Sequence, residues 1–203
     1  MMPTFRSVLC ALALMLSSDL SSAVSTDAGL PPIATPTRTS TTFQAVPEVI
    51  CDTTCVNKVY KIYAKNRNLF DQCIVDSDYQ IFPHTGKYPN SSQLRALVES
   101  PACIAIFTAV LLADIPACDL GGTPLRSAAE TLLTLKVDIV DDGHKPPTSA
   151  RFKELMLWRH AVGLAQAANV PCDSRSELFA QYTRNLGIAL SDSSVQVFMD
   201  YTV

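Results

Sequence analysis

Cysteine and histidine are the side chains of this sequence best suited to nucleophilic, proton-transfer or metal chemistry, and the chain has seven cysteines and three histidines. Cys51 and Cys55 form a C-x3-C spacing, but the second pair of ligands that a zinc site needs does not follow it. None of His84, His144 and His160 lies in an H-E-x-x-H motif, and no G-x-S-x-G nucleophile turn occurs. We therefore expect no enzyme, no catalytic residue, no metal and no cofactor.

The N-terminal segment determines how the cysteines are interpreted. Residues 1–23 have a basic Arg6, an apolar run over residues 8–16 and a Ser-Ser-Ala exit that ends at Ala23. This order is typical of a signal peptide. The apolar run is too short for a membrane anchor, which needs about 20 residues. We predict a secreted, extracellular protein that is cleaved near Ala23 and has no integral membrane span.

Cleavage removes Cys10 and leaves an even number of cysteines. In an exported chain, such a set indicates three disulfides rather than reactive thiols. The six cysteines are Cys51, Cys55, Cys73, Cys103, Cys118 and Cys172. The formal net charge of the chain is -3, so no basic excess is present to neutralise phosphates, and we expect no nucleic-acid partner.

The rest of the chain divides into a polar tract and a helical part. Residues 24–47 are rich in Ser, Thr and Pro, and we predict a flexible, O-glycosylated spacer outside the fold. From residue 48 onward, apolar residues recur at helical spacing, and residues 103–112 are apolar on all sides, which is typical of a buried helix. Residues 76–90 have no helical period and predict a loop or small hairpin. The predicted fold class is all-α.

A sequon interrupts this helical part. Asn90-Ser91-Ser92 is an acceptor for N-glycosylation in an exported chain, so we predict a glycan on Asn90. Ser91 or Ser92 is the residue that we expect to cap the helix that follows.

Three flanked cysteine motifs occur in a fixed order. They are Phe70-Asp-Gln-Cys73 followed by Asp76-Ser-Asp-Tyr79, then Ser100-Pro-Ala-Cys103, then Ile115-Pro-Ala-Cys118-Asp-Leu120, with fifteen residues from Cys103 to Cys118. This order resembles the elicitins, a family of sterol-carrying proteins secreted by oomycete plant pathogens. The resemblance implies a disulfide-stapled helical domain over residues 48–142. Residues 143–203 form a helical extension, and either a degenerate half-repeat or a chance likeness explains its echo of the domain.

The resemblance also implies a disulfide pattern. In elicitins the first cysteine pairs with the fifth and the second with the fourth, which gives Cys51–Cys118 and Cys73–Cys103 here. The third family bridge would join the positions of Val98 and Asp142, and neither is cysteine. We expect the two remaining cysteines, Cys55 and Cys172, to pair with each other.

The function implied by the resemblance is the binding of a sterol or another lipid in an apolar cavity. The residues expected to line it are Tyr79, Leu94, Leu97, Ile106, Phe107, Val110 and Leu132. Perception by a plant cell-surface receptor, with a hypersensitive defence response, is the second expectation from the family. The alternative is a structural or interaction effector that has the same scaffold and a filled core, because buried helices of any function carry such residues. Both alternatives stay open at this stage.

Overall fold

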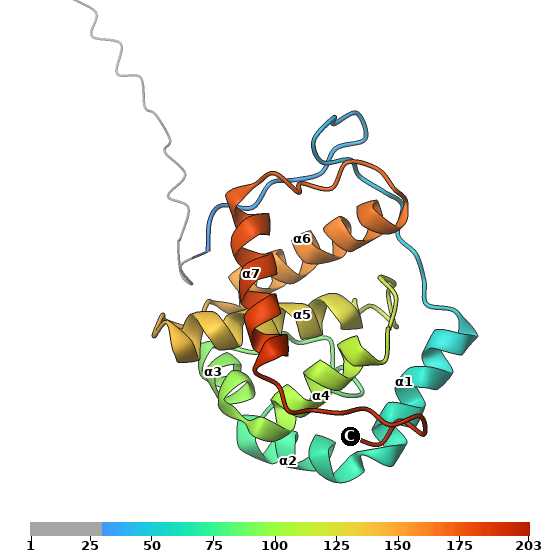
Figure 1. Ribbon diagram of the computed structural model, residues 1–203, viewed down its shortest axis with the longest axis vertical. Helices are drawn as coiled ribbons and strands as arrows, with labels where there is room; N and C mark the ends of the chain where they lie inside the picture. Colours follow the sequence, from blue (N-terminus) through green and yellow to red (C-terminus); the bar gives the residue numbers. More distant parts are fainter. Residues whose placement is uncertain (1–29) are drawn as a thin grey trace, which may run out of the picture.

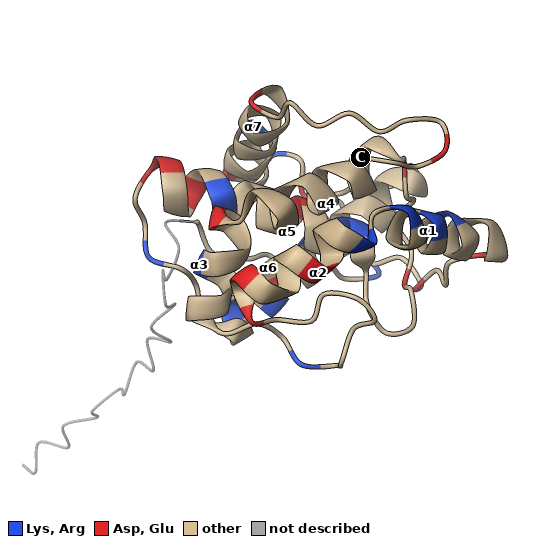
Figure 2. Cartoon of the chain, turned by 90° about the horizontal axis from the view of Figure 1, so that it is seen from below, with Lys and Arg blue, Asp and Glu red and all other residues tan. Residues whose placement is uncertain are grey.

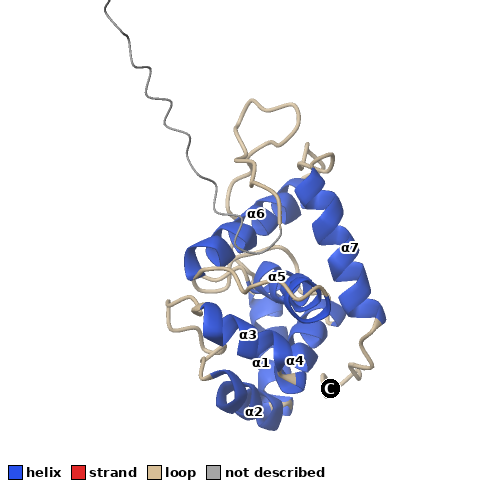
Figure 3. Cartoon of the chain, turned by 90° about the vertical axis from the view of Figure 1, so that its left-hand side faces the viewer, coloured by secondary structure: helices blue, strands red, loops and turns tan. Residues whose placement is uncertain are grey.

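The computed structural model describes residues 30–203 (Figure 1). The predicted signal peptide and the first residues of the predicted spacer lie outside the described residues. The helices are α1 (Thr53–Lys65), α2 (Arg67–Ser77), α3 (Ser91–Glu99), α4 (Pro101–Leu112), α5 (Leu125–Lys136), the π-helical segment η1 (Val137–Asp141), α6 (Ser149–Ala167) and α7 (Glu177–Ser191). Within residues 30–203 only isolated β-bridges occur and no strand (Figure 3). The all-α prediction is confirmed.

Helix α5 is the centre of this arrangement. It packs against α3 and α4 on the side of the elicitin-like segment and against α6 and α7 of the extension (Figures 1 and 3). Every residue from Ala129 to Leu135 is buried. Helix α4 is buried from Ala102 to Val110 apart from two half-covered positions, as its apolar sequence predicts. The loop between α2 and α3 is irregular and forms no hairpin.

Two of the three expected disulfides are confirmed. Cys51–Cys118 ties the residues before α1 to the loop after α4, and Cys73–Cys103 ties α2 to α4. The third expected pair, Cys55–Cys172, is wrong, since both cysteines are free among the described residues. Cys55 is buried in the first turn of α1, where its Sγ lies 3.7 Å from Sγ of Cys118. Cys172 lies in the loop between α6 and α7, next to a different part of the chain.

That part is residues 30–50, which we call the N-terminal strap. Leu30 and Phe43 are 1% and 2% exposed, and Phe43 forms a β-bridge with Cys172. The amide of Gln44 donates to the carbonyl of Pro171 at 2.8 Å. The strap therefore lies beside the connection between α6 and α7 (Figure 1). This differs from the expectation of a spacer outside the fold, because two apolar side chains and a few backbone hydrogen bonds hold a tract that is otherwise Ser-, Thr- and Pro-rich.

The two ends of the described chain both return to the helices. Asn66, buried between α1 and α2, donates from Nδ2 to the carbonyl of Tyr201 at 2.7 Å and accepts from the amide of Val203 at 2.8 Å. Basic residues run along α1 (Figure 2), and its Lys65 lies 3.7 Å from Asp200 near the C-terminus. No single helix among residues 30–203 has the length and apolar character to cross a membrane. Helices α3 and α4 have that length and apolar character only when taken together, and they are bent by 80° at the break between them.

The first prediction concerns the cap of α3. Asn90, rather than Ser91 or Ser92, is the N-cap. Its Oδ1 accepts from the amide of Gln93 at 2.9 Å, and Oε1 of Gln93 accepts from the amide of Asn90 at 3.1 Å. Asn90→Ala should lower the free energy of unfolding by about 1 kcal/mol, because a helix amide loses its acceptor. Asn90→Asp is the matched control and should retain the stability. Denaturant unfolding of unglycosylated protein measures both.

The same pair of variants tests the predicted glycan. The cap uses Oδ1, so it does not compete for Nδ2, the atom to which a glycan is attached. Secreted wild-type protein should therefore lose mass after glycosidase treatment, whereas both variants should not. Equal stability of the two variants would contradict the capping role of Asn90, and an unshifted wild-type mass would contradict the glycan.

The second prediction concerns the thiols. Alkylation of the secreted protein under denaturing, non-reducing conditions should modify Cys55 and Cys172 and leave Cys51–Cys118 and Cys73–Cys103 as disulfide-linked peptides. Peptide mapping by mass spectrometry reads this out. A peptide that links Cys55 to Cys172 would restore the pairing expected from the sequence.

Candidate ligand cavity

An apolar cavity of about 60 Å³ lies between the α2–α3 loop and helices α3, α4, α5 and α6. Its lining residues are Tyr79, Ile81, His84, Tyr88, Pro89, Leu97, Phe107, Thr123, Leu125, Ala128, Ala129, Leu132, Phe152 and Met156. Most of them come from the segment whose motifs resemble elicitins. The last two come from α6, in the extension.

Four of the seven residues expected to line a cavity do so: Tyr79, Leu97, Phe107 and Leu132. The other three, Leu94, Ile106 and Val110, are 0%, 3% and 4% exposed and are packed in the core away from the cavity wall. Helical periodicity identifies a buried face, but it does not distinguish side chains that touch a cavity from those that touch a neighbouring helix.

Sequence reasoning missed the wall that α6 contributes. The apolar spacing of Phe152 and Met156 indicates a buried stripe, yet no signal in the sequence says that this stripe faces the elicitin-like segment. Loop residues Ile81, His84 and Tyr88 were missed for another reason. A loop without a period gives no prediction of which side chains point inward.

The polar side chains that line the cavity are Tyr79, Tyr88, His84 and Thr123. Tyr79 Oη donates to the carbonyl of Lys87 at 2.7 Å and lies 3.4 Å from Nδ1 of His84. Burial, with a smaller contribution from Tyr88, raises the pKa of Tyr79 to about 12, so its hydroxyl stays protonated. Burial also lowers the pKa of His84, which keeps the imidazole neutral at pH 7. The cavity is therefore uncharged. Its hydrogen-bonding groups come from the α2–α3 loop and from Thr123, whose buried hydroxyl has no hydrogen-bond partner among the described residues.

A surface groove adjoins the cavity. It has a volume of about 260 Å³ and is lined by Val56 and Tyr60 of α1 and by residues of two loops. Cavity and groove have four residues in common: Ile81, His84, Thr123 and Leu125. These four side chains form a thin wall between the interior and the surface.

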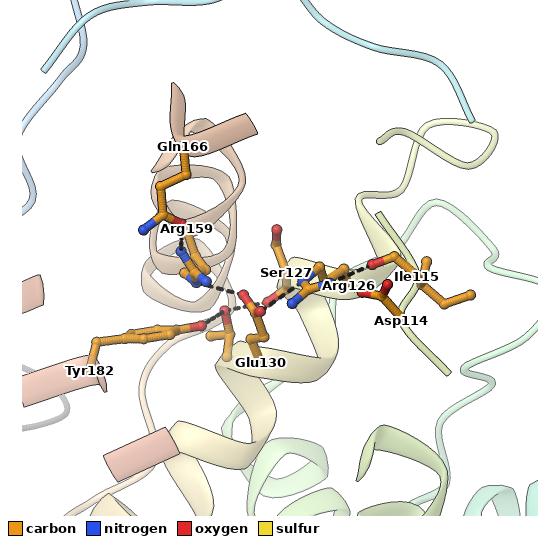
Figure 4. Close-up of polar contacts among 9 residues, drawn as sticks. Asp114, Ile115, Arg126, Ser127, Glu130, Arg159, Gln166 and Tyr182 are labelled. Atoms are coloured by element: carbon orange, nitrogen blue, oxygen red, sulfur yellow. Dashed lines mark hydrogen bonds and ion pairs between the residues drawn. The ribbon is translucent and has the colours of Figure 1, made fainter. Parts of the chain in front are cut away.

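The position of α6 is fixed by a buried charge network (Figure 4). The carboxylate of Glu130, on α5, is 3% exposed and lies 3.0 Å from Nε of Arg126 and 2.5 Å from Nε of Arg159 on α6. Arg126 also donates to the carbonyl of Ile115 at 2.8 Å. One residue further on, the hydroxyl of Thr131 lies 2.9 Å from that of Tyr182 on α7. The network joins α5 to both helices of the extension.

These elements define a class: a small helical domain, closed by two disulfides around an apolar cavity. Residues 50–135 match the family model described as Elicitin, and the elicitin-like resemblance inferred from the motifs is confirmed. We call these matched residues the elicitin-family segment. Searches of curated proteins and of solved structures gave no significant match. The matched segment includes α1 to α4 and most of α5. It leaves out α6, α7 and nearly all of the strap.

The third prediction follows from the network. Glu130→Ala should lower the free energy of unfolding by about 3–5 kcal/mol, because Arg159 would keep a buried charge without a partner. Glu99→Ala is the matched control: Glu99 pairs with Arg95 at 3.2 Å but is 50% exposed, so its loss should cost about 0–1 kcal/mol. Chemical denaturation measures the difference. Equal effects of the two substitutions would show that the network does not hold α6.

Proposed function

We propose that the protein is a secreted elicitin-like carrier that binds a sterol or another lipid in the cavity between the α2–α3 loop and α6. The observation that carries the proposal is an apolar, uncharged cavity lined mostly by the elicitin-family segment, with the hydroxyl of Tyr79 at its loop side. Apolar walls with a few placed polar groups are the usual form of a small-molecule site. Such a site suits a ligand that is mostly hydrocarbon and has one polar end.

Ligand binding requires the cavity to expand. Its volume of about 60 Å³ is well below the roughly 300–1,000 Å³ of a site for a drug-sized ligand. Ile81 and His84 of the wall belong to an irregular loop, and loops are generally more mobile than the helices they connect. A ligand in the groove would displace this wall, and Tyr79 would exchange the carbonyl of Lys87 for a ligand oxygen.

Two features support export. Residues 1–23 have the sequence of a signal peptide, and the two disulfides require an oxidising compartment. An exported lipid carrier of this family would meet the plant cell surface, where recognition by a receptor and a hypersensitive response would follow. That recognition is the biological part of the proposal.

A second candidate is an interaction effector that uses the elicitin scaffold without a ligand. The small volume of the cavity favours it, as does the complete burial of Leu94 and Leu97. In this case the cavity would be an ordinary packing defect. Perception by plants, if it occurs, would then depend on the protein surface and not on a bound lipid.

The fourth prediction separates these candidates. Organic extraction of the natively secreted protein should release a lipid in near-stoichiometric amount, and titration with fluorescent lipids should refill the emptied cavity. Ala128→Leu should weaken uptake about tenfold or more without loss of thermal stability, because Ala128 lines the cavity and the larger side chain fills it.

Ala180→Leu is the control, since Ala180 is exposed on α7 and the same change there should leave uptake intact. If the wild type yields no lipid and takes up none, the carrier proposal fails and the filled-core effector stands. If Ala128→Leu takes up lipid as the wild type does, the ligand site lies elsewhere.

A further inference from the structure

We propose that Phe152 and Met156 of α6 form a size filter, which limits the cavity to flexible single-chain lipids and excludes fused-ring sterols. The inference rests on the proposed function of lipid binding, and it adds the class of ligand. The two residues lie outside the segment that matches the elicitin family, so this wall is an addition of the extension.

The filter consists of two adjacent side chains. Phe152 and Met156 are four residues apart on one face of α6 and are 3% and 1% exposed. Both line the cavity, and the ring of Phe152 also packs edge to face on Tyr88 of the α2–α3 loop, with 6.4 Å between ring centroids. They occupy space within the boundary of the cavity that a larger ligand would need.

The beginning of α6 is fastened to both neighbouring parts of the chain. Ser149 Oγ donates to the carbonyl of Pro89 at 2.7 Å, and Ser91 Oγ donates to the carbonyl of Pro147 at 2.9 Å. On the outside, Arg151 donates to the carbonyl of Pro31 in the strap at 2.6 Å. The residues that make these bonds at the start of α6 lie within five residues of Phe152. The filter is therefore a fixed wall, and opening it would break several hydrogen bonds together.

Further along α6, two ionisable contacts add to this restraint. Arg159 is paired with Glu130 at 2.5 Å, and Nε2 of His160 lies 2.6 Å from Oε1 of Glu48 in the strap. The side chains of Arg159 and His160 are mostly buried, with exposed fractions of 14% and 6%. α6 is thus held from the α5 side and from the strap side along its length.

The shape of the available space then selects the ligand. A cavity of about 60 Å³ is smaller than the roughly 150 Å³ cavity that admits benzene, so a rigid four-ring molecule would have to displace α6. A flexible chain can instead bend from the cavity into the adjoining groove of about 260 Å³. It needs to move only the four side chains that the two spaces share, and two of them, Ile81 and His84, belong to the irregular loop. The wall toward the groove, which contains Ile81 and His84, can move, whereas the wall of Phe152 and Met156 is held in place and excludes rings.

The test uses the secreted full-length chain and two fluorescent probes, a polyene fatty acid and a fluorescent sterol. Wild type should bind the fatty acid and bind the sterol about tenfold more weakly or not at all. Phe152→Ala and Met156→Ala should each strengthen sterol binding by about tenfold and change fatty-acid binding little. Leu155→Ala is the matched control, because Leu155 is 0% exposed on the same helix but does not line the cavity, and it should alter neither affinity.

Circular dichroism would reveal whether Phe152→Ala folds. If it does not, Phe152→Leu replaces it as the test variant, because it keeps most of the apolar volume. The size filter is overturned if the folded wild type binds the sterol as tightly as the fatty acid. It is also overturned if the folded variants keep the wild-type ratio of the two affinities. If the wild type binds neither probe while the variants gain sterol binding, the exclusion of sterols by Phe152 and Met156 is upheld, whereas the single-chain ligand class and the carrier function of the wild type fail. If neither wild type nor variants bind either probe, both proposals fail.

Discussion

The carboxylate of Glu130 lies between the guanidinium groups of Arg126 and Arg159, at the contact between the elicitin-family segment and the extension. Arg126 comes from the same helix, whereas Arg159 comes from α6. A buried carboxylate is tolerated only when its partners are present, because its desolvation is otherwise uncompensated. The burial of α5 therefore depends on α6, and the segment that matches the family model does not contain all the residues that complete its own core.

This dependence changes how the chain is divided. A division at residue 142 follows the motifs, but contacts join the two sides of that boundary. Glu130 and Thr131 bind residues of α6 and α7, and Phe152 lines a cavity formed mostly by the elicitin-family segment. The strap then adds a further layer over α6. The extension and the strap together are part of one core with the elicitin-family segment.

Sequence reasoning predicted the parts of the fold that depend on local pattern. The helices and the buried character of α4 follow from periodicity. The disulfides Cys51–Cys118 and Cys73–Cys103 follow from the resemblance to elicitins that the flanked motifs carry. It failed where distant segments meet. Pairing Cys55 with Cys172 treated two leftover residues as partners, although Cys55 lies against Cys118 and Cys172 lies against Phe43. Leu30 and Phe43 are isolated hydrophobes in a polar tract, and composition alone does not show that such residues anchor a strap.

The buried Cys55 thiol has a consequence for oxidative folding. Cys118 has two possible sulfur partners, since Cys51 is bonded to it and Cys55 lies 3.7 Å away. Attack of the Cys55 thiolate on Sγ of Cys118 would form a Cys55–Cys118 bond and release Cys51 as the thiolate, with no net oxidation. Burial raises the pKa of Cys55, so few molecules carry the attacking thiolate at neutral pH and more do so in alkali. Protein refolded at alkaline pH should thus contain two disulfide isomers, which acidic quenching would trap and chromatography would separate.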